Sequence, residues 1–152
     1  MNQVESRMLL CRVHDLHCAI PLEHVAETMR PLPVESIAGM PAFVAGMAIV
    51  RGSPIPVVDA AWLLCGMASP ATRFVIVKSG DRHIALAVEA VTGVVDLSRD
   101  VLAALPPLLQ GAHLDAVAGV GTLDGGLLIA LQASHLMPDD VWTTFQAAQA
   151  AA

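Results

Sequence analysis

The chain has 152 residues, of which 55% are apolar and only 14% are charged, and its formal net charge is −6. This length suits one domain or two small lobes, and it can bury a hydrophobic core without disulfide staples. Charged residues are too few for a disordered chain. The single lysine and seven scattered arginines form no basic stripe, and three Phe and two Trp offer little for base stacking, so no nucleic-acid partner is expected.

Neither membrane insertion nor secretion is expected. The longest uncharged apolar stretch, Ile37–Val50, is interrupted by Pro41 and ends before Arg51, short of the roughly 20 residues of a spanning helix. The polar N-terminus, Met1–Arg7, contains no signal-peptide pattern. The three cysteines are odd in number and each lies in apolar sequence, which predicts buried, reduced thiols in a cytoplasmic protein.

Gly and Pro interrupt the chain about every 8 to 15 residues, a spacing typical of short β-strands. The strands predicted in the first half are Met8–Val13, Leu16–Ile20, Phe43–Val50 and Pro54–Asp59, with turns at His14-Asp15 and Arg51-Gly52-Ser53. Pro54 and Pro56 lack the N–H that a strand ladder needs, so the last strand is expected at a sheet edge or a bulge. Leu22–Met29 is either helical or extended, and Ala60–Cys65 is predicted to be a short helix ending at Gly66.

Small residues at 68–72 form the best candidate boundary between two lobes. The strands predicted beyond it are Arg73–Lys78, Arg82–Glu89, Val91–Leu97, Val117–Leu123 and Leu127–Leu131, with hairpin turns at Ser79-Gly80-Asp81 and Asp124-Gly125-Gly126. Pro106-Pro107 is placed in a loop, and the chain is expected to turn helical from Leu131 to Met137. Pro138-Asp139-Asp140 predicts the start of a C-terminal helix, because acidic residues suit the positive end of a helix dipole.

These elements predict an all-β fold. Each half holds about four to six short strands, which suits two small β-barrels packed side by side with short connecting helices. The sequence leaves open whether strands cross between the lobes and whether the C-terminal helix docks.

Catalytic patterns are sparse, and neither an enzyme nor a cofactor is expected. Gly119-Val-Gly121 resembles the start of a dinucleotide fingerprint, but Asp124 replaces its third glycine and the segment leads into a hairpin. No G-x-S-x-G segment is present. Cys65 follows an apolar run, which predicts a buried and unreactive thiol.

A cluster near the N-terminus offers an alternative function, a small thiol- or metal-dependent sensor. Its members are Cys11, His14, His17, Cys18 and His24. Thiols and imidazoles are zinc ligands, but their spacing here matches no C-x₂-C or H-x₃-H pair. The simpler interpretation is two core thiols, opposite each other in a hairpin, beside solvated histidines, and no metal is expected.

Two charged residues stand out in otherwise apolar surroundings. Glu27 follows Val25-Ala26, and Arg51 follows a long uncharged stretch. Arginine suits a protein contact because it packs and donates several hydrogen bonds at once. The alternative interpretation is that each of the two residues is an ordinary surface charge. A third interpretation of the function of the whole chain is a general module for self-association.

The segment P-A-F-V-A-G-M-A-I-V-R-G-S-P-I-P-V-V-D, at 41–59, resembles the hallmark segment of the CheW-like family of bacterial chemosensory coupling proteins. Val25-Ala26-Glu27 resembles the V-x-E of the family, and Ala87–Val91 resembles its V-D-x-V, with Glu89 in place of Asp. Ala118–Val120 and Leu127–Leu131 resemble its last hairpin. The departures are Ile49-Val50, where many members have Asn-Leu, and Ala60, where Leu is usual.

The resemblance implies two SH3-like, five-stranded barrels with a hydrophobic groove between them, within 7–137, followed by a C-terminal helix or tail at 138–152. It implies no catalysis. The implied partners are the regulatory domain of a CheA-type histidine kinase and the cytoplasmic tip of a chemoreceptor, at receptor arrays beneath the inner membrane. The receptor tip is a helical hairpin, which suits recognition of a helix in a groove. The implied partner-binding residues are Val25, Glu27, Gly46, Val50, Arg51 and Gly52.

Overall fold

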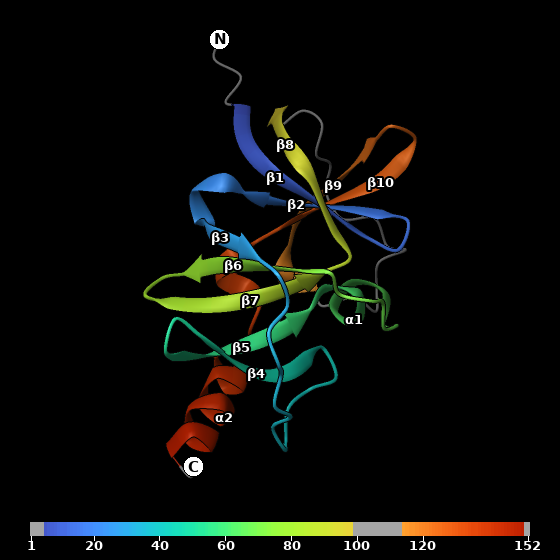
Figure 1. The fold of residues 1–152 in the computed structure, drawn as a ribbon. Coiled ribbons are helices and arrows are strands. Elements are labelled where there is room, and N and C mark those ends of the chain that lie inside the picture. Colours follow the sequence, from blue (N-terminus) through green and yellow to red (C-terminus); the bar gives the residue numbers. More distant parts are fainter. Residues whose placement is uncertain (1–4, 99–113, 151–152) are drawn as a thin grey trace.

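The computed structural model describes residues 5–98 and 114–150. Its ten described strands form two five-stranded sheets (Figure 1). The first sheet has the order β8 (Ala90–Ser98), β1 (Glu5–Val13), β2 (Leu16–Pro21), β10 (Gly126–Leu131) and β9 (Val117–Leu123). The second sheet has the order β3 (Val25–Met29), β6 (Arg73–Ser79), β7 (Arg82–Val88), β5 (Ser53–Asp59) and β4 (Val44–Val50). The predicted β fold of two five-stranded units with short connecting helices is therefore confirmed, as two mixed sheets.

Both sheets are mixed, and their topology is alike. Neighbouring strands are antiparallel except for two pairs, β2 with β10 and β5 with β7. The chain enters the second sheet after β2 through a short 3-10 turn, Leu22–His24, and returns to the first sheet at Glu89, between β7 and β8. Residues 68–72 join α1 (Ala60–Cys65) to β6, and β5 and β6 on either side belong to the same sheet. The strands are therefore not divided between the sheets at 68–72.

Side-chain alternation divides the buried residues into three clusters. In β7, Ile84, Leu86 and Val88 face one cluster while Ala85 and Ala87 face another, as the period of two predicts. All five strands of the second sheet contribute to one cluster, and all five strands of the first sheet contribute to its counterpart. The third and largest cluster lies between the sheets and also receives residues of both helices. Each sheet thus has its own interior, and the two sheets share a core.

The second sheet curls until its two outer strands approach each other. The chain that leaves β3 reaches β4 at Glu35, which pairs with Met47 through two backbone hydrogen bonds of 2.8 Å. Gly46 permits this approach: its φ is +148°, and a Cβ there would lie 2.0 Å from the carbonyl oxygen of Glu35. A residue with any side chain at 46 would therefore push the two segments apart.

The prolines of β5 occupy an unexpected place. Sequence predicted an edge strand or a bulge, but β5 lies between β7 and β4 in the second sheet. The pairing of β5 with β7 covers only 57–59, whereas Pro54 and Pro56 pair with β4 alone. The strand has neighbours on both sides only at 57–59. At Pro54 and Pro56 the side that faces β7 is unpaired, so the missing N–H groups of the prolines remove no recorded hydrogen bond to β7.

Both predicted helices form. The carboxylate of Asp59 caps α1 by accepting from the N–H of Ala61 and Trp62, and Gly66 ends it with a φ of +66°. The C-terminal helix α2 (Asp139–Ala150) docks on the shared core through Val141, Trp142 and Phe145.

Three further segments, at 131–137, 22–29 and 106–107, differ in how far they match the sequence-based expectation. Leu131–Met137 is not a full helical segment, because only a 3-10 turn at Ala133–His135 forms there. Leu22–Met29, left open by sequence, is a 3-10 turn followed by a strand. The predicted loop at Pro106-Pro107 lies outside the described residues.

Candidate partner-binding site

A salt bridge between Glu27 and Arg51 joins the two sides of the curled second sheet. Glu27 lies on β3, at one edge, and Arg51 lies in the turn between β4 and β5, at the other. The Nε of Arg51 donates to both carboxylate oxygens of Glu27, at 3.1 and 2.9 Å, and its Nη2 lies 2.8 Å from Oε2. The carboxylate raises the pKa of Arg51 through this hydrogen bond and its charge, so the guanidinium stays charged.

The turn geometry presents this arginine to solvent. Arg51 and Gly52 both have positive φ, +50° and +82°, and Val50 pairs with Ser53 across them. Tight two-residue hairpin turns need such angles. The side chain of Arg51 is 76% exposed whereas that of Glu27 is only 28% exposed. An exposed pair of this kind adds little to folding stability.

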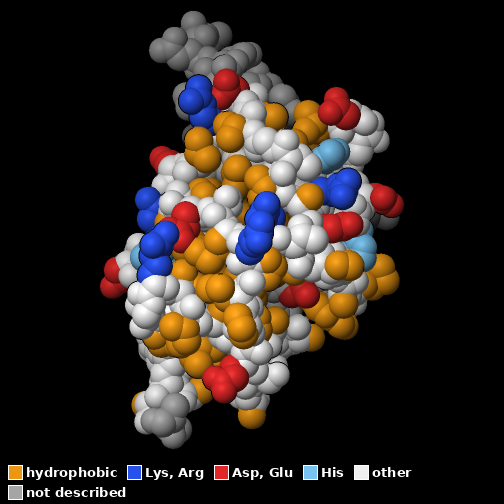
Figure 2. Space-filling view, in the orientation of Figure 1, with side chains coloured by type: hydrophobic (Ala, Val, Ile, Leu, Met, Phe, Trp, Pro, Cys, Tyr) orange, Lys and Arg blue, Asp and Glu red, His pale blue; other side chains and the backbone are white. Residues whose placement is uncertain are grey.

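The salt bridge borders a small pocket of about 200 Å³ at the open end of the curled sheet. Buried Val50, Ile55 and Ile76 form its apolar floor, and they belong to the interior cluster of the second sheet. Glu27, Arg51, Ser53 and His83 supply its polar side chains, and Ala26 completes the lining. In Figure 2, charged and histidine side chains gather at the left edge, beside the β6–β7 turn, and hydrophobic side chains cover much of the surface below them.

Three of the six predicted site residues, Glu27, Val50 and Arg51, meet at this pocket. Gly52 lies beside them in the exposed turn. Gly46 is instead buried below Glu35, where it allows the close approach described above. Val25 begins β3 and packs against the core between the sheets. Gly46 and Val25 therefore shape the second sheet and do not line the pocket.

Sequence reasoning missed Ser53, Ile55, Ile76 and His83. Alternation placed His83 and Ile84 on opposite faces of their strand, which correctly indicated that His83 leaves the shared core. No local pattern could connect it with Glu27, however, because β6 and β7 form a local hairpin but β3 joins them only through its long-range pairing with β6.

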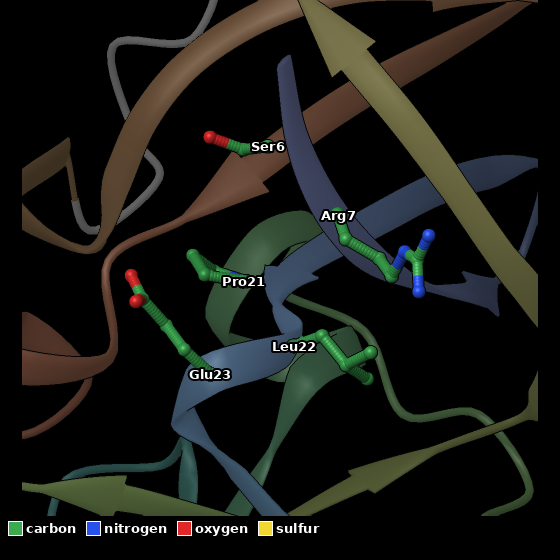
Figure 3. Close-up of a pocket in the computed structure, with 5 residues that line it drawn as sticks. All are labelled: Ser6, Arg7, Pro21, Leu22 and Glu23. Carbon is green, nitrogen blue, oxygen red and sulfur yellow. The ribbon is translucent and has the colours of Figure 1, made fainter. Parts of the chain in front are cut away.

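Two other hollows lie away from this pocket. One, of about 240 Å³, lies where the sheets meet, and its lining includes Pro21 and Leu131 of the first sheet and Lys78 of the second. It matches the expected groove between lobes in position, but Glu27 and Arg51 do not line it. The other, of about 490 Å³, is lined by Ser6, Arg7, Pro21, Leu22 and Glu23. There Arg7 and Glu23 point in different directions (Figure 3), and Arg7 pairs with Asp96 at 3.4 Å instead.

The five residues of the N-terminal cluster do not converge. Cys11 and Cys18 are paired opposite each other in the β1–β2 hairpin, as predicted, and both are buried in the shared core. His17 precedes Cys18 on the same strand and so faces the other side of the sheet, and His14 lies in the turn. In the described part of the chain, no three His, Cys, Asp or Glu side chains are placed to hold a metal ion.

We expect the thiols of the native protein to react slowly. Burial raises the pKa of Cys11 to about 12 and also raises the pKa of Cys18, which is fully buried. Partial burial raises the pKa of Cys65, which is the most accessible of the three thiols. Because the thiolate is the reactive form, a disulfide reagent at pH 8 should modify Cys65 first and the other two only on unfolding. Rapid modification of Cys11 and Cys18 in folded protein would contradict this and would revive the sensor interpretation.

Glu89 lies where the chain returns to the first sheet, and its contacts with the β1–β2 hairpin stabilise this junction. Its Oε2 accepts from the backbone N–H of His14 at 2.9 Å, and its Oε1 lies 3.9 Å from Arg12. Its own backbone N–H donates to the carbonyl of Arg12 at 3.1 Å, and its carbonyl accepts from the hydroxyl of Thr72. The V-E-A-V segment is thus a structural junction.

Replacing Glu89 should separate its hydrogen bond from its charge. Glu89→Ala leaves the N–H of His14 without its acceptor, and we expect the free energy of unfolding to fall by about 1–3 kcal/mol. Glu89→Gln retains an acceptor and should lose clearly less. Urea unfolding of both variants tests this, and equal losses would mean that the charge, rather than the hydrogen bond, matters.

No helix in the described ranges is long and apolar enough to cross a membrane. The CheW-like domain family model matches residues 7–141. The chain is 22% identical over 143 residues to the probable chemotaxis protein CheW of Rhizobium etli, covering 91% of this chain and 92% of the relative. It is 24% identical over 136 residues to the chemotaxis protein CheW of Rhizobium meliloti, covering 88% of each.

The fold is also similar to the crystal structure of the scaffolding protein TtCheW from Thermoanaerobacter tengcongensis. The TM-score is 0.77 at 19% identity, and the superposition covers 92% of each chain. The family match includes both sheets and the start of α2. The chain therefore belongs to the CheW-like domain family.

Proposed function

We propose that this chain is a non-catalytic scaffold that couples chemoreceptors to a CheA-type histidine kinase. The observation that carries this function is the family match over 7–141, which includes both sheets. A coupler must present two separate faces, and two sheets around a shared core provide a rigid body on which those faces keep their spacing.

In finer detail, the partners are the regulatory domain of the kinase and the cytoplasmic tip of the receptor, so the protein acts in the cytoplasm, at arrays beneath the inner membrane. Glu27, Arg51 and Gly52 form the contact surface, with Val50 beneath them. Gly46 and Val25 support that surface from behind. Signalling then changes the contacts between the chain and its two partners and involves no reaction on the chain. The repeated weak contacts of an array gain strength through multivalency.

Two features of the exposed pair support its place in the contact surface. Arg51 is held in one orientation by Glu27 although most of its side chain is in solvent. A held arginine loses less conformational freedom on binding than a free one, which favours it as an anchor.

Affinity purification from the source organism, followed by mass spectrometry, tests the proposal. Recovery of a CheA-type kinase together with chemoreceptors would support the coupling function and identify the pathway. Recovery of neither, from cells that express both, would contradict it. The same purification with an Arg51→Glu bait tests the contact surface. An Arg7→Glu bait is its matched control, because Arg7 is also an exposed, paired arginine but lies on the first sheet.

A further inference from the structure

The C-terminal helix α2 reaches across from one sheet to the other. The chain leaves the first sheet at Leu131, the last residue of β10, and two side chains of α2 then contact the second sheet and its connections. Trp142 lies against Arg82 of β7, and a Cβ on Gly39, between β3 and β4, would lie 3.8 Å from the Cγ2 of Thr144. Figure 1 shows α2 beyond β4 and β5, at the end of the molecule opposite to β8. The helix is therefore a strap that joins the end of the first sheet to the second.

Apolar packing holds this strap on the sheets. Val141, Trp142 and Phe145 are at most 8% exposed and belong to the shared core, and the rings of Trp142 and Phe145 meet edge to face at 6.0 Å. In the described part of the chain, the hydrogen bonds recorded for α2 stay within the helix or reach back only to Pro138. A free helix of 12 residues is only marginally stable in water, so α2 depends on this packing.

Arg82 adds a charged contact to this packing. The central carbon of its guanidinium lies 4.8 Å from the centroid of the Trp142 ring, within the range of a cation–π interaction. Arg82 begins β7, where the period of two places it on the same face as Ile84, a residue of the shared core. Among the described residues, no ion pair with a carboxylate is recorded for Arg82, so the Trp142 ring is the recorded contact of its charge.

We infer that α2 is a conformational strap that opens as a unit while both sheets stay folded, and that Arg82 is the latch that keeps it closed. Each sheet has an interior cluster that includes no residue of α2, so both interiors can survive the opening. In the open state only the shared core loses side chains, those of Val141, Trp142 and Phe145. A helix held by so few contacts belongs to the low-stability end of the fold. The strap is a property of the chain itself and requires no partner.

Native-state hydrogen exchange of the full chain, followed by NMR at low urea concentrations, tests the strap. The amides in the middle of α2 should have protection factors at least about tenfold lower than the slowest amides of β1 and β7. Their exchange should also depend only weakly on urea, because the opening of one helix exposes little surface. Equal protection factors with equal urea dependence in α2 and in the sheets would mean that α2 opens only in global unfolding, which would overturn the inference.

Three variants test the latch in the same experiment. Arg82→Met keeps much of the apolar length of the side chain but removes its charge, and it should lower the protection factors of α2 about two- to fivefold. Arg82→Lys retains a cation and should lower them less. Arg73→Ala is the matched control, because Arg73 is an exposed arginine at the opposite end of the β6–β7 hairpin, and it should leave α2 unchanged.

Unchanged protection of α2 in folded Arg82→Met protein, or an equal loss in Arg73→Ala, would show that Arg82 is not the latch. The dispersed amide signals of the two sheets report whether each variant is folded. Because no partner is present in either experiment, a failure here leaves the proposed coupling function untouched.

Discussion

Arg51→Glu should abolish or strongly weaken the binding of at least one partner and leave the protein folded. The new carboxylate would face Glu27, whose side chain is only 28% exposed, so the turn and β3 would repel each other at the surface. An arginine at a contact also provides hydrogen bonds that a glutamate cannot donate. We expect a loss of about tenfold or more in affinity for that partner, measured by isothermal titration with each purified partner.

The folded state should survive the change, because Arg51 is exposed and its position, with a φ of +50°, already holds a residue with a long side chain. The thermal midpoint and the circular dichroism spectrum should stay close to those of the wild type. Arg7→Glu, which breaks a similar exposed pair with Asp96, should bind both partners normally. Unchanged binding by folded Arg51→Glu protein would remove this residue from the contact surface.

Gly46→Ala should be the most destabilising single-methyl change in the second sheet. The added Cβ would lie 2.0 Å from the carbonyl oxygen of Glu35 and 2.7 Å from its carbon, both of them backbone atoms that a rotamer change cannot move. The φ of +148° is also unfavourable for alanine. Relief of the clash requires breaking the two hydrogen bonds between Glu35 and Met47. We expect a loss of about 3 kcal/mol or more in the free energy of unfolding.

Gly52→Ala is the matched control, because it introduces backbone strain without a steric clash. Gly52 also has positive φ, +82°, but no atom lies within 4 Å of its ideal Cβ position. Its cost should be only about 1 kcal/mol, from backbone strain alone. Urea unfolding of the two variants side by side measures the difference, and comparable losses would mean that the approach of Glu35 to β4 contributes nothing.

Local sequence patterns were sufficient for most elements of the fold. The hairpins could be located because their turns have residues that tolerate positive φ, such as Asp124-Gly125 and His14. Asp59 and Gly66 bounded α1 for equally local reasons. The resemblance named Glu27 and Arg51 separately as partner-binding residues, and the structure places the two in contact.

Long-range pairing explains what sequence could not provide. Which strands share a sheet depends on contacts such as β1 with β8, which no local pattern encodes. The same is true of the curl that brings Glu35 to Met47 and His83 to the side of Arg51. The sequence therefore indicated the two charged residues, but neither their contact nor the pocket that they border.

The most direct test of coupling is a sedimentation assay with receptor-containing membranes and the purified kinase. Kinase alone should sediment weakly with these membranes, and wild-type chain should increase the sedimented kinase until the sites are saturated. Arg51→Glu should fail to do so at the same concentration, whereas Arg7→Glu should act as the wild type does. If the wild-type chain binds each partner separately but never increases kinase on the membranes, it is not a bridge, and the proposed coupling is wrong.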